Sequence, residues 1–147
     1  MFKHLLVATD GSKLSQKAVL HGIGLASALG ARLTAFYASS DYPSPMYSEA
    51  SIYIPMKRRE YAALCKREAD HIMDPIAAKA RSAGLEFNAV HSIAPVPWRA
   101  ILAAAKKNKC DAIVMASHGR RGVSALLLGS ETQKVLTHSK LPVIVVR

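Results

Sequence analysis

Short apolar runs alternate with helical patterns along the whole chain, and this alternation limits the possible folds more than any other feature. Five runs are typical of strands buried in a sheet, at residues 3–11, 32–38, 85–93, 111–117 and 142–146. Between them, apolar residues recur at helical spacing in residues 12–29, 57–83, 98–108 and 130–139. Every connection is therefore a helix, which predicts a parallel sheet with right-handed crossovers and helices on both faces.

The expected fold class is α/β: a single doubly wound domain over residues 1–147, with a five-stranded parallel sheet of order 3-2-1-4-5. A chain of 147 residues suits one domain, and no linker or internal repeat divides it. The 57–83 helix is expected to bury a stripe formed by Tyr61, Leu64, Ile72, Ile76 and Ala80.

Composition narrows the class of protein. Half of the residues are hydrophobic and no apolar run reaches the roughly 18 residues of a membrane span, so we expect none. The N-terminal run leads into Asp10 and Gly11 rather than into a signal-peptide cleavage site. Without a secretory signal, Cys65 and Cys110 are expected to be reduced and the protein cytoplasmic. The net charge of +10 indicates an anionic partner: nucleic acid, acidic lipid headgroups or a small phosphate ligand.

The expected strand order places a ligand site between the first and fourth strands, because open parallel sheets bind ligands where the strand order reverses. The first strand ends in the segment ATDGS and the fourth in MASHGRRG. These two loops would face each other across the crevice.

The loop after the fourth strand suits a phosphate. Glycines let backbone N–H groups approach an anion and adopt positive φ at little cost. Gly129 and Ser130 directly precede a helix, whose N-terminus favours phosphate, and Arg120 and Arg121 add positive charge. Two plainer interpretations stay open: a capping box in residues 130–133, and an Asx turn at Asp10.

Other chemistry finds little support. The six histidines lack metal-ligand spacing, no Ser-His-Asp or Cys-His constellation can be placed, and the Walker A and GxGxxG patterns are absent. The basic segment 56–70 also contains Glu60, Glu68 and Asp70, so it predicts a solvated helix face and no nucleic-acid partner. We expect no dedicated enzyme activity, although slow ATP hydrolysis is conceivable.

The C-terminal stretch VMASHGRRGVSALLLGSETQKVLTHSKLPVIVV resembles the signature of the universal stress proteins, and LLVATDGS resembles their first strand and its Asp-bearing turn. The likeness covers essentially the whole chain. It implies an ATP-binding regulatory protein of the stress response whose nucleotide state modulates a protein partner.

The nucleotide-binding branch of that family carries the motif G-x2-G-x9-G-S/T. Gly119, nine residues and Gly129-Ser130 match its last three elements, whereas Ala116 replaces its first glycine. A second branch lacks the motif, so an alternative is a dimeric interaction protein of the same fold without a physiological nucleotide.

The resemblance also implies site residues. Asp10 would hold the ribose or the neighbouring phosphate region, and Ala8, Thr9 and Ala38 would line the adenine and ribose pocket. Met115, Ala116 and Gly119 would approach the nucleotide by backbone. Arg120, Gly129, Ser130, Glu131 and Thr132 would hold the phosphates. The ligand would be ATP, AMP or ADP, with Mg²⁺ bound mainly through the phosphates.

The last strand predicts a homodimer. Val143, Ile144, Val145 and Val146 would form an apolar outer edge, and such edges are usually covered or paired with another chain. A two-fold dimer through this strand is the simplest solution, and the universal stress proteins commonly use it.

Overall fold

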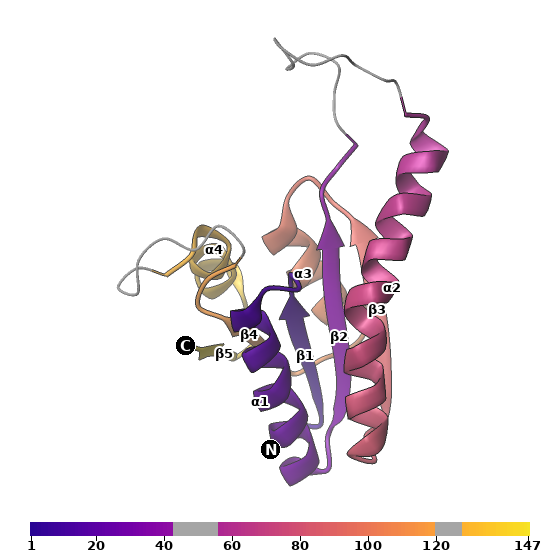
Figure 1. Cartoon of the computed structure of the whole chain (residues 1–147). Helices are drawn as coiled ribbons and strands as arrows, with labels where there is room; N and C mark the ends of the chain where they lie inside the picture. Colours follow the sequence, from indigo (N-terminus) through magenta and orange to yellow (C-terminus); the bar gives the residue numbers. More distant parts are fainter. Residues whose placement is uncertain (43–55, 120–127) are drawn as a thin grey trace.

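The computed structural model describes residues 1–42, 56–119 and 128–147 (Figure 1). Its elements follow one another as β1 (His4–Thr9), α1 (Lys13–Leu29), β2 (Arg32–Ser39), α2 (Arg58–Ser82), β3 (Phe87–Ile93), α3 (Pro97–Lys107), β4 (Ala112–Ala116), α4 (Ser130–His138) and β5 (Val143–Val146). The strands form one sheet of order β3-β2-β1-β4-β5, and all four pairings are parallel. The predicted fold class and strand order are confirmed.

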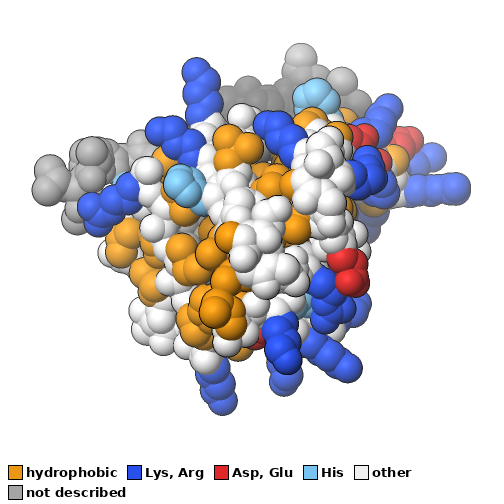
Figure 2. All heavy atoms as spheres, turned by 90° about the horizontal axis from the view of Figure 1, so that it is seen from below, with side chains coloured by type: hydrophobic (Ala, Val, Ile, Leu, Met, Phe, Trp, Pro, Cys, Tyr) orange, Lys and Arg blue, Asp and Glu red, His pale blue; other side chains and the backbone are white. Residues whose placement is uncertain are grey.

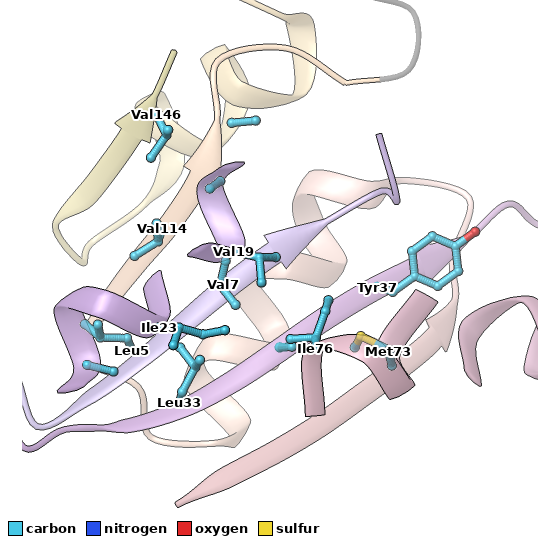
Figure 3. Close-up of a cluster of buried hydrophobic side chains, with 14 of the residues drawn as sticks. Leu5, Val7, Val19, Ile23, Leu33, Tyr37, Met73, Ile76, Val114 and Val146 are labelled. Atoms are coloured by element: carbon cyan, nitrogen blue, oxygen red, sulfur yellow. The ribbon is translucent and has the colours of Figure 1, made fainter. Parts of the chain in front are cut away.

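Helices cover both faces of the sheet, as the crossovers require. Helices α1 and α2 pack on one face, where Leu5, Val7 and Leu33 are fully buried (Figure 3). Helices α3 and α4 pack on the other face over Leu6 and Phe36. The alternation of successive β1 side chains between these two clusters explains why the strand is a continuous apolar run.

The register brings the ends of β1 and β4 level with each other. Val7 pairs with Val114, and Leu6 pairs with Ile113. Continuing this register by three residues places Asp10 beside Ser117, where each chain leaves the sheet. The two loops that the sequence predicts to face each other therefore begin side by side, at the carboxyl end of the sheet.

The buried stripe of α2 differs from the expected one. The residues buried against the sheet are Cys65, Ala69, Met73, Ile76 and Ala80. Ile76 and Ala80 were correctly predicted, but Leu64 is 45% exposed and its neighbour Cys65 is buried instead. At the start of α2, the buried face is therefore shifted by one residue from the predicted one.

Helix α1 approaches the sheet closely through small residues. A Cβ on Gly22 would lie 3.4 Å from the Cβ of Val7, while Ala18 and Ala26 are fully buried. Ser12 begins the helix by accepting a hydrogen bond from the N–H of Ser15, and Gly30 ends it at φ 61°. The Ser12 cap fixes the turn between β1 and α1, and Gly30 leads the chain into β2 at the other end of the helix.

Candidate nucleotide site

The turn after β1 fixes the carboxylate of Asp10. Its Oδ1 accepts a hydrogen bond from the N–H of Ser12 at 2.9 Å, which is the expected Asx turn. Gly11 adopts φ 78°, a conformation that favours glycine. Thr9 is buried, and its hydroxyl is hydrogen-bonded to that of Ser15 at 2.9 Å. The Thr9 side chain therefore anchors the start of α1.

Gly119 packs directly against Asp10 from the opposite side of the crevice. A Cβ on Gly119 would lie 2.6 Å from Oδ2 of Asp10, a separation that real Cβ atoms essentially never show. Gly119 does not need a positive φ. A larger residue at position 119 would require the Asp10 carboxylate to move, so the two loops meet at Asp10 and Gly119.

Gly129, at the end of the same loop, also allows a close backbone contact. Its N–H donates to the carbonyl of Ser117 at 2.8 Å, and a Cβ would lie 3.2 Å from that carbonyl oxygen and 3.3 Å from Cα of His118. Its φ of −60° is open to any residue, so close backbone contact again explains the glycine. This contact holds the start of α4 against the end of β4.

Gly129 is the N-cap of α4, and Ser130 is the first helical residue. The capping-box interpretation, with Ser130 as N-cap, is therefore wrong. The first N–H groups of any α-helix lack intrahelical acceptors and carry the positive end of the helix dipole. At α4 they belong to Ser130, Glu131 and Thr132, beside Gly119 and Asp10.

Two of the three residues assigned to the base pocket, Ala8 and Ala38, share one face of the sheet with Met115, which was expected to approach the nucleotide by its backbone. Ala8 and Met115 are buried in the cluster under α3 and α4, and Ala38 packs against the same cluster. Ala116 is the last residue of β4, pairs with Val146 and is buried. It does not adopt a positive φ, so the methyl group that replaces the family's glycine causes no backbone strain.

Two predicted phosphate residues use their side chains elsewhere. The Thr132 hydroxyl donates to the carbonyl of Ala116 at 2.9 Å, which ties α4 to β4. The Glu131 carboxylate accepts a hydrogen bond from the N–H of Trp98 at 2.8 Å, and Lys134 lies 3.3 Å from its other oxygen. Both side chains are therefore engaged within the protein, and the prediction that these residues hold the phosphates concerns their backbone N–H groups.

The loop after β4 also contains His118, Arg120 and Arg121. Arg120 and Arg121 lie outside the described residues. His118 bonds through Nδ1 to the Ser117 hydroxyl at 2.9 Å, and its buried Nε2 has no partner in the part of the chain that the structure describes. The histidine therefore helps to shape the loop.

Trp98 is a residue that the sequence did not connect with the site. Its backbone N–H donates to the Glu131 carboxylate, and the centroid of its ring lies 4.5 Å from that of His138. Trp98 therefore contacts both ends of α4. The signal in the sequence was the pair Pro97-Trp98 at a helix start, which gives no information about a partner 33 residues away.

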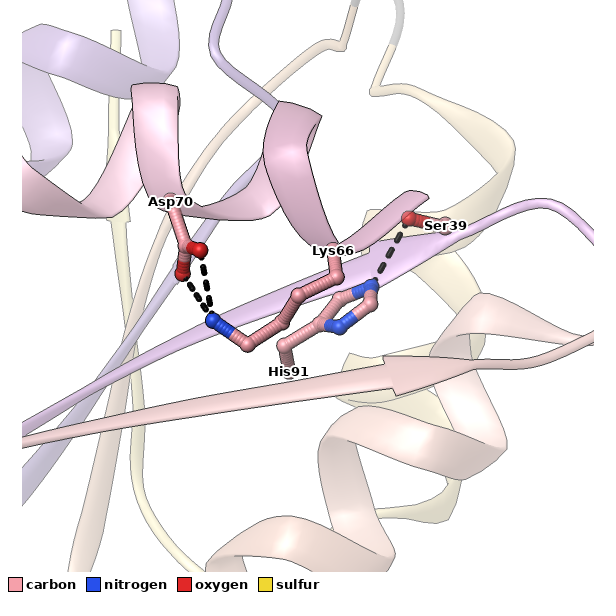
Figure 4. Close-up of polar contacts among 4 residues, drawn as sticks. All are labelled: Ser39, Lys66, Asp70 and His91. Carbon is pink, nitrogen blue, oxygen red and sulfur yellow. Dashed lines mark hydrogen bonds and ion pairs between the residues drawn. The ribbon is translucent and has the colours of Figure 1, made fainter. Parts of the chain in front are cut away.

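A second polar cluster lies between α2 and the adjacent strands (Figure 4). The Ser39 hydroxyl is hydrogen-bonded to Nε2 of His91 at 2.8 Å, and Lys66 forms an ion pair with Asp70. Burial and the nearby Lys66 ammonium lower the pKa of His91. The cluster has neither a base-orienting carboxylate bonded to His91 nor an exposed serine, because Ser39 is buried.

The described residues of the site have features that suit an anion. Gly119 and Gly129 let the end of β4, the Asp10 turn and the start of α4 approach one another closely, and the helix N-terminus beside them favours an anion. Across residues 1–42, 56–119 and 128–147, no three His, Cys, Asp or Glu side chains are grouped to hold a metal ion. In the same segments, no helix is long and apolar enough to cross a membrane.

Comparison with known proteins identifies the family. The sequence matches the model of the Universal stress protein family over residues 1–147. It is 34% identical to the "Universal stress protein in QAH/OAS sulfhydrylase 3'region" of Thermus aquaticus over 152 residues, covering all of both chains. It is 31% identical to the Universal stress protein YxiE of Bacillus subtilis over 149 residues, again covering all of both.

A solved structure supports the same assignment. The fold matches that of a universal stress protein in complex with cAMP with a TM-score of 0.72 and 25% identity, covering 99% of this chain and 97% of the other. The Asp10 turn, the two loop glycines and the strand order thus occur in a chain that aligns with these relatives from end to end. The protein belongs to the universal stress protein family.

Proposed function

We infer that the chain binds an adenine nucleotide, ATP or its products AMP and ADP, in the crevice between β1 and β4. The contact between Asp10 and Gly119 carries this proposal, because it fixes a carboxylate beside the loop glycine at the point where strand order reverses. The relative of known structure that holds cAMP supports an adenine nucleotide.

Each part of the nucleotide has a matching part of the site. A carboxylate accepts hydrogen bonds from ribose hydroxyls but repels phosphate, so Asp10 suits the ribose. The first N–H groups of α4, with the Ser130 hydroxyl, suit the phosphates. Ala38 is partly buried and offers apolar surface to the base, whereas Ala8 and Met115 are buried in the cluster under α3 and α4. Mg²⁺ would arrive on the phosphates and keep water ligands, which agrees with the acid-poor crevice.

The function that follows is regulatory rather than catalytic. A bound nucleotide would bridge the β1 turn, the β4 loop and α4, so its presence or absence would change how these segments are held. We infer that a protein partner in the stress response distinguishes these states, in the cytoplasm. Ala116 fits its strand without strain, so it gives no structural reason to prefer the alternative of a protein without nucleotide.

The proposed assembly is a homodimer through β5. This strand pairs with β4 on one side only and ends the sheet. Val143, Ile144 and Val145 are half-buried in the single chain, as expected for apolar residues that a second chain would cover.

The first test is whether the purified protein holds or takes up nucleotide. Protein denatured after purification should release an adenine nucleotide on chromatography, or the emptied protein should bind added Mg-ATP in calorimetry. Folded protein that does neither would contradict the proposal and favour the alternative without nucleotide.

A further inference from the structure

The edge of the sheet opposite the crevice gathers much of the positive charge of the chain. At this amino edge the strands begin and α2 and α3 end, so basic side chains from separate segments meet. The exposed ones are Lys3, Arg32, Lys79, Arg81, Lys106, Lys107, Lys109 and Lys140. Figure 2 views the molecule from this end and shows Lys and Arg side chains around much of the rim.

Acidic residues offset little of this charge. The same segments contribute two carboxylates, Glu86 and Asp111, against eight basic side chains, which gives +6 of the total +10. Glu86 lies 3.6 Å from the Arg32 guanidinium. The Asp111 carboxylate accepts hydrogen bonds from the N–H groups of Lys3 and His4 at 2.7 and 3.1 Å.

Helix dipoles explain only part of the arrangement. Lys79, Arg81, Lys106 and Lys107 lie in the last turns of α2 and α3, where basic side chains ordinarily complement the negative end of the dipole. Lys3, Arg32, Lys109 and Lys140 lie outside the helices, at or near the start of strands. The excess charge therefore belongs to the edge as a whole.

An apolar hollow opens at the same edge. Its lining consists of Met1, Phe2, Leu25, Leu29, Asp111 and Ile144, and the last of these also belongs to the strand of the proposed dimer. Met1 is 99% exposed. Figure 2 shows hydrophobic side chains gathered over part of this face, inside the basic rim. Exposed apolar side chains that are rimmed by charge mark a surface that meets another molecule.

We propose that the amino edge is a peripheral binding surface for an anionic lipid bilayer. Lys and Arg would contact the headgroup phosphates, and clusters of roughly four to eight basic residues are sufficient for such binding. The side chains of Met1 and of the apolar residues that line the hollow would enter the boundary between headgroups and acyl chains. Nucleic acid would use the charge but would leave the apolar side chains without a partner, so the bilayer fits both features.

This surface is independent of the proposed nucleotide site. The crevice lies at the carboxyl edge, so a chain resting on a bilayer through its amino edge keeps the crevice open to water. Failure of nucleotide binding would therefore leave this proposal unaffected, and the reverse also holds.

The test is sedimentation of untagged protein with vesicles. Binding is expected to vesicles of phosphatidylcholine with about one third phosphatidylserine, and not to pure phosphatidylcholine. Raising the salt concentration should weaken the binding, because screening reduces the attraction of exposed charges. Absence of binding to the anionic vesicles at low salt would overturn the proposal.

Two variants with equal net charge locate the surface. K106E/K107E/K140E reverses three amino-edge charges and should weaken binding by about 100-fold or more. K17E/R59E/R67E reverses three exposed charges elsewhere and should keep most of the binding. Circular dichroism verifies that both are folded. Equal losses of binding in the two variants would mean that only the total charge matters, which would contradict the proposal. Tighter binding to a DNA or RNA duplex than to anionic vesicles would also contradict it, because it would assign the edge to nucleic acid.

Discussion

Gly129 and Ser130 make different contributions at the start of α4, and two substitutions separate them. In Gly129→Val the new side chain would press on the Ser117 carbonyl and on Cα of His118, so α4 must shift away from β4. Nucleotide affinity should then fall by about tenfold or more. Ser130→Ala should weaken binding by only about fivefold, the value of one hydrogen bond, and should leave the free energy of unfolding almost unchanged because Ser130 is not the cap. Calorimetry with Mg-ATP and denaturant unfolding measure both effects; normal binding by Gly129→Val would place the phosphates elsewhere.

Two half-buried or buried histidines predict how stability depends on pH. Burial, with Arg32 nearby, lowers the pKa of His4, and burial, with Lys66 nearby, lowers the pKa of His91. Both therefore stay neutral in the folded chain at pH values where the unfolded chain takes up protons. Stability should be complete above the unfolded value near 6.5 and should decrease as pH falls below it. Thermal unfolding between pH 8 and about pH 5 measures this loss.

The matched variant for this effect is His4→Asn with His91→Asn, which removes both groups. Its melting temperature should depend less on pH across the same interval, although it should be lower throughout because the bonds to Thr34 and Ser39 change. An unchanged pH dependence would show that other groups cause the loss of stability at acidic pH.

The close approach of the two loops was predictable, because backbone packing there decides the residue type. Asp10, Gly119 and Gly129 lie where the sequence placed them, because a turn and a close backbone approach permit few alternatives. The side chains of Glu131 and Thr132 were not predictable. Their partners, Trp98 and the Ala116 carbonyl, are distant in sequence and are brought near only by the packing of α4 on α3 and β4.

At the scale of elements, Glu131 joins the proposed phosphate helix to α3. Its carboxylate caps the first turn of α3 through the N–H of Trp98, where a negative charge is also favoured by the dipole. Glu131→Ala should therefore lower the free energy of unfolding by about 1 kcal/mol. Nucleotide affinity should stay the same or rise, because a negative charge near the phosphates is lost.

The control is Glu131→Gln, whose amide oxygen still accepts the Trp98 hydrogen bond and should restore part of the stability. Because the Trp98 ring also contacts His138, its fluorescence should report changes at this junction in every variant. A loss of nucleotide binding in Glu131→Gln equal to that in Gly129→Val would mean that the carboxylate itself holds the ligand.

Element types were easier to predict than the faces of the helices. The strands and helices of the described residues follow the alternation of apolar runs and helical patterns, since both periods are local properties of the sequence. The predicted buried stripe of α2 was wrong at Leu64, because Leu64 and its neighbour Cys65 could each have faced the sheet. Only the angle at which α2 crosses the sheet decides between them.

At the scale of the whole molecule, the strand order followed from general rules on crossovers together with the assumed order of a doubly wound sheet. Assembly of two chains through β5 can be tested by one substitution. Val145→Lys would place a charge on the half-buried outer strand, so the variant should become monomeric or aggregate. Light scattering should report about twice the chain mass for the wild type. A wild type that is a stable monomer at micromolar concentration would contradict the dimer.

A calorimetric comparison of two glycine variants tests whether the nucleotide binds between Asp10 and Gly119. Gly119→Ala adds a single methyl group whose carbon would lie 2.6 Å from the Asp10 carboxylate, whereas Gly24→Ala adds the same group where nothing lies within 4 Å. Gly24→Ala should bind Mg-ATP like the wild type and be equally or more stable, since alanine favours a helix. Gly119→Ala should remain folded and bind about tenfold more weakly or not at all. Equal binding by both variants would contradict the account.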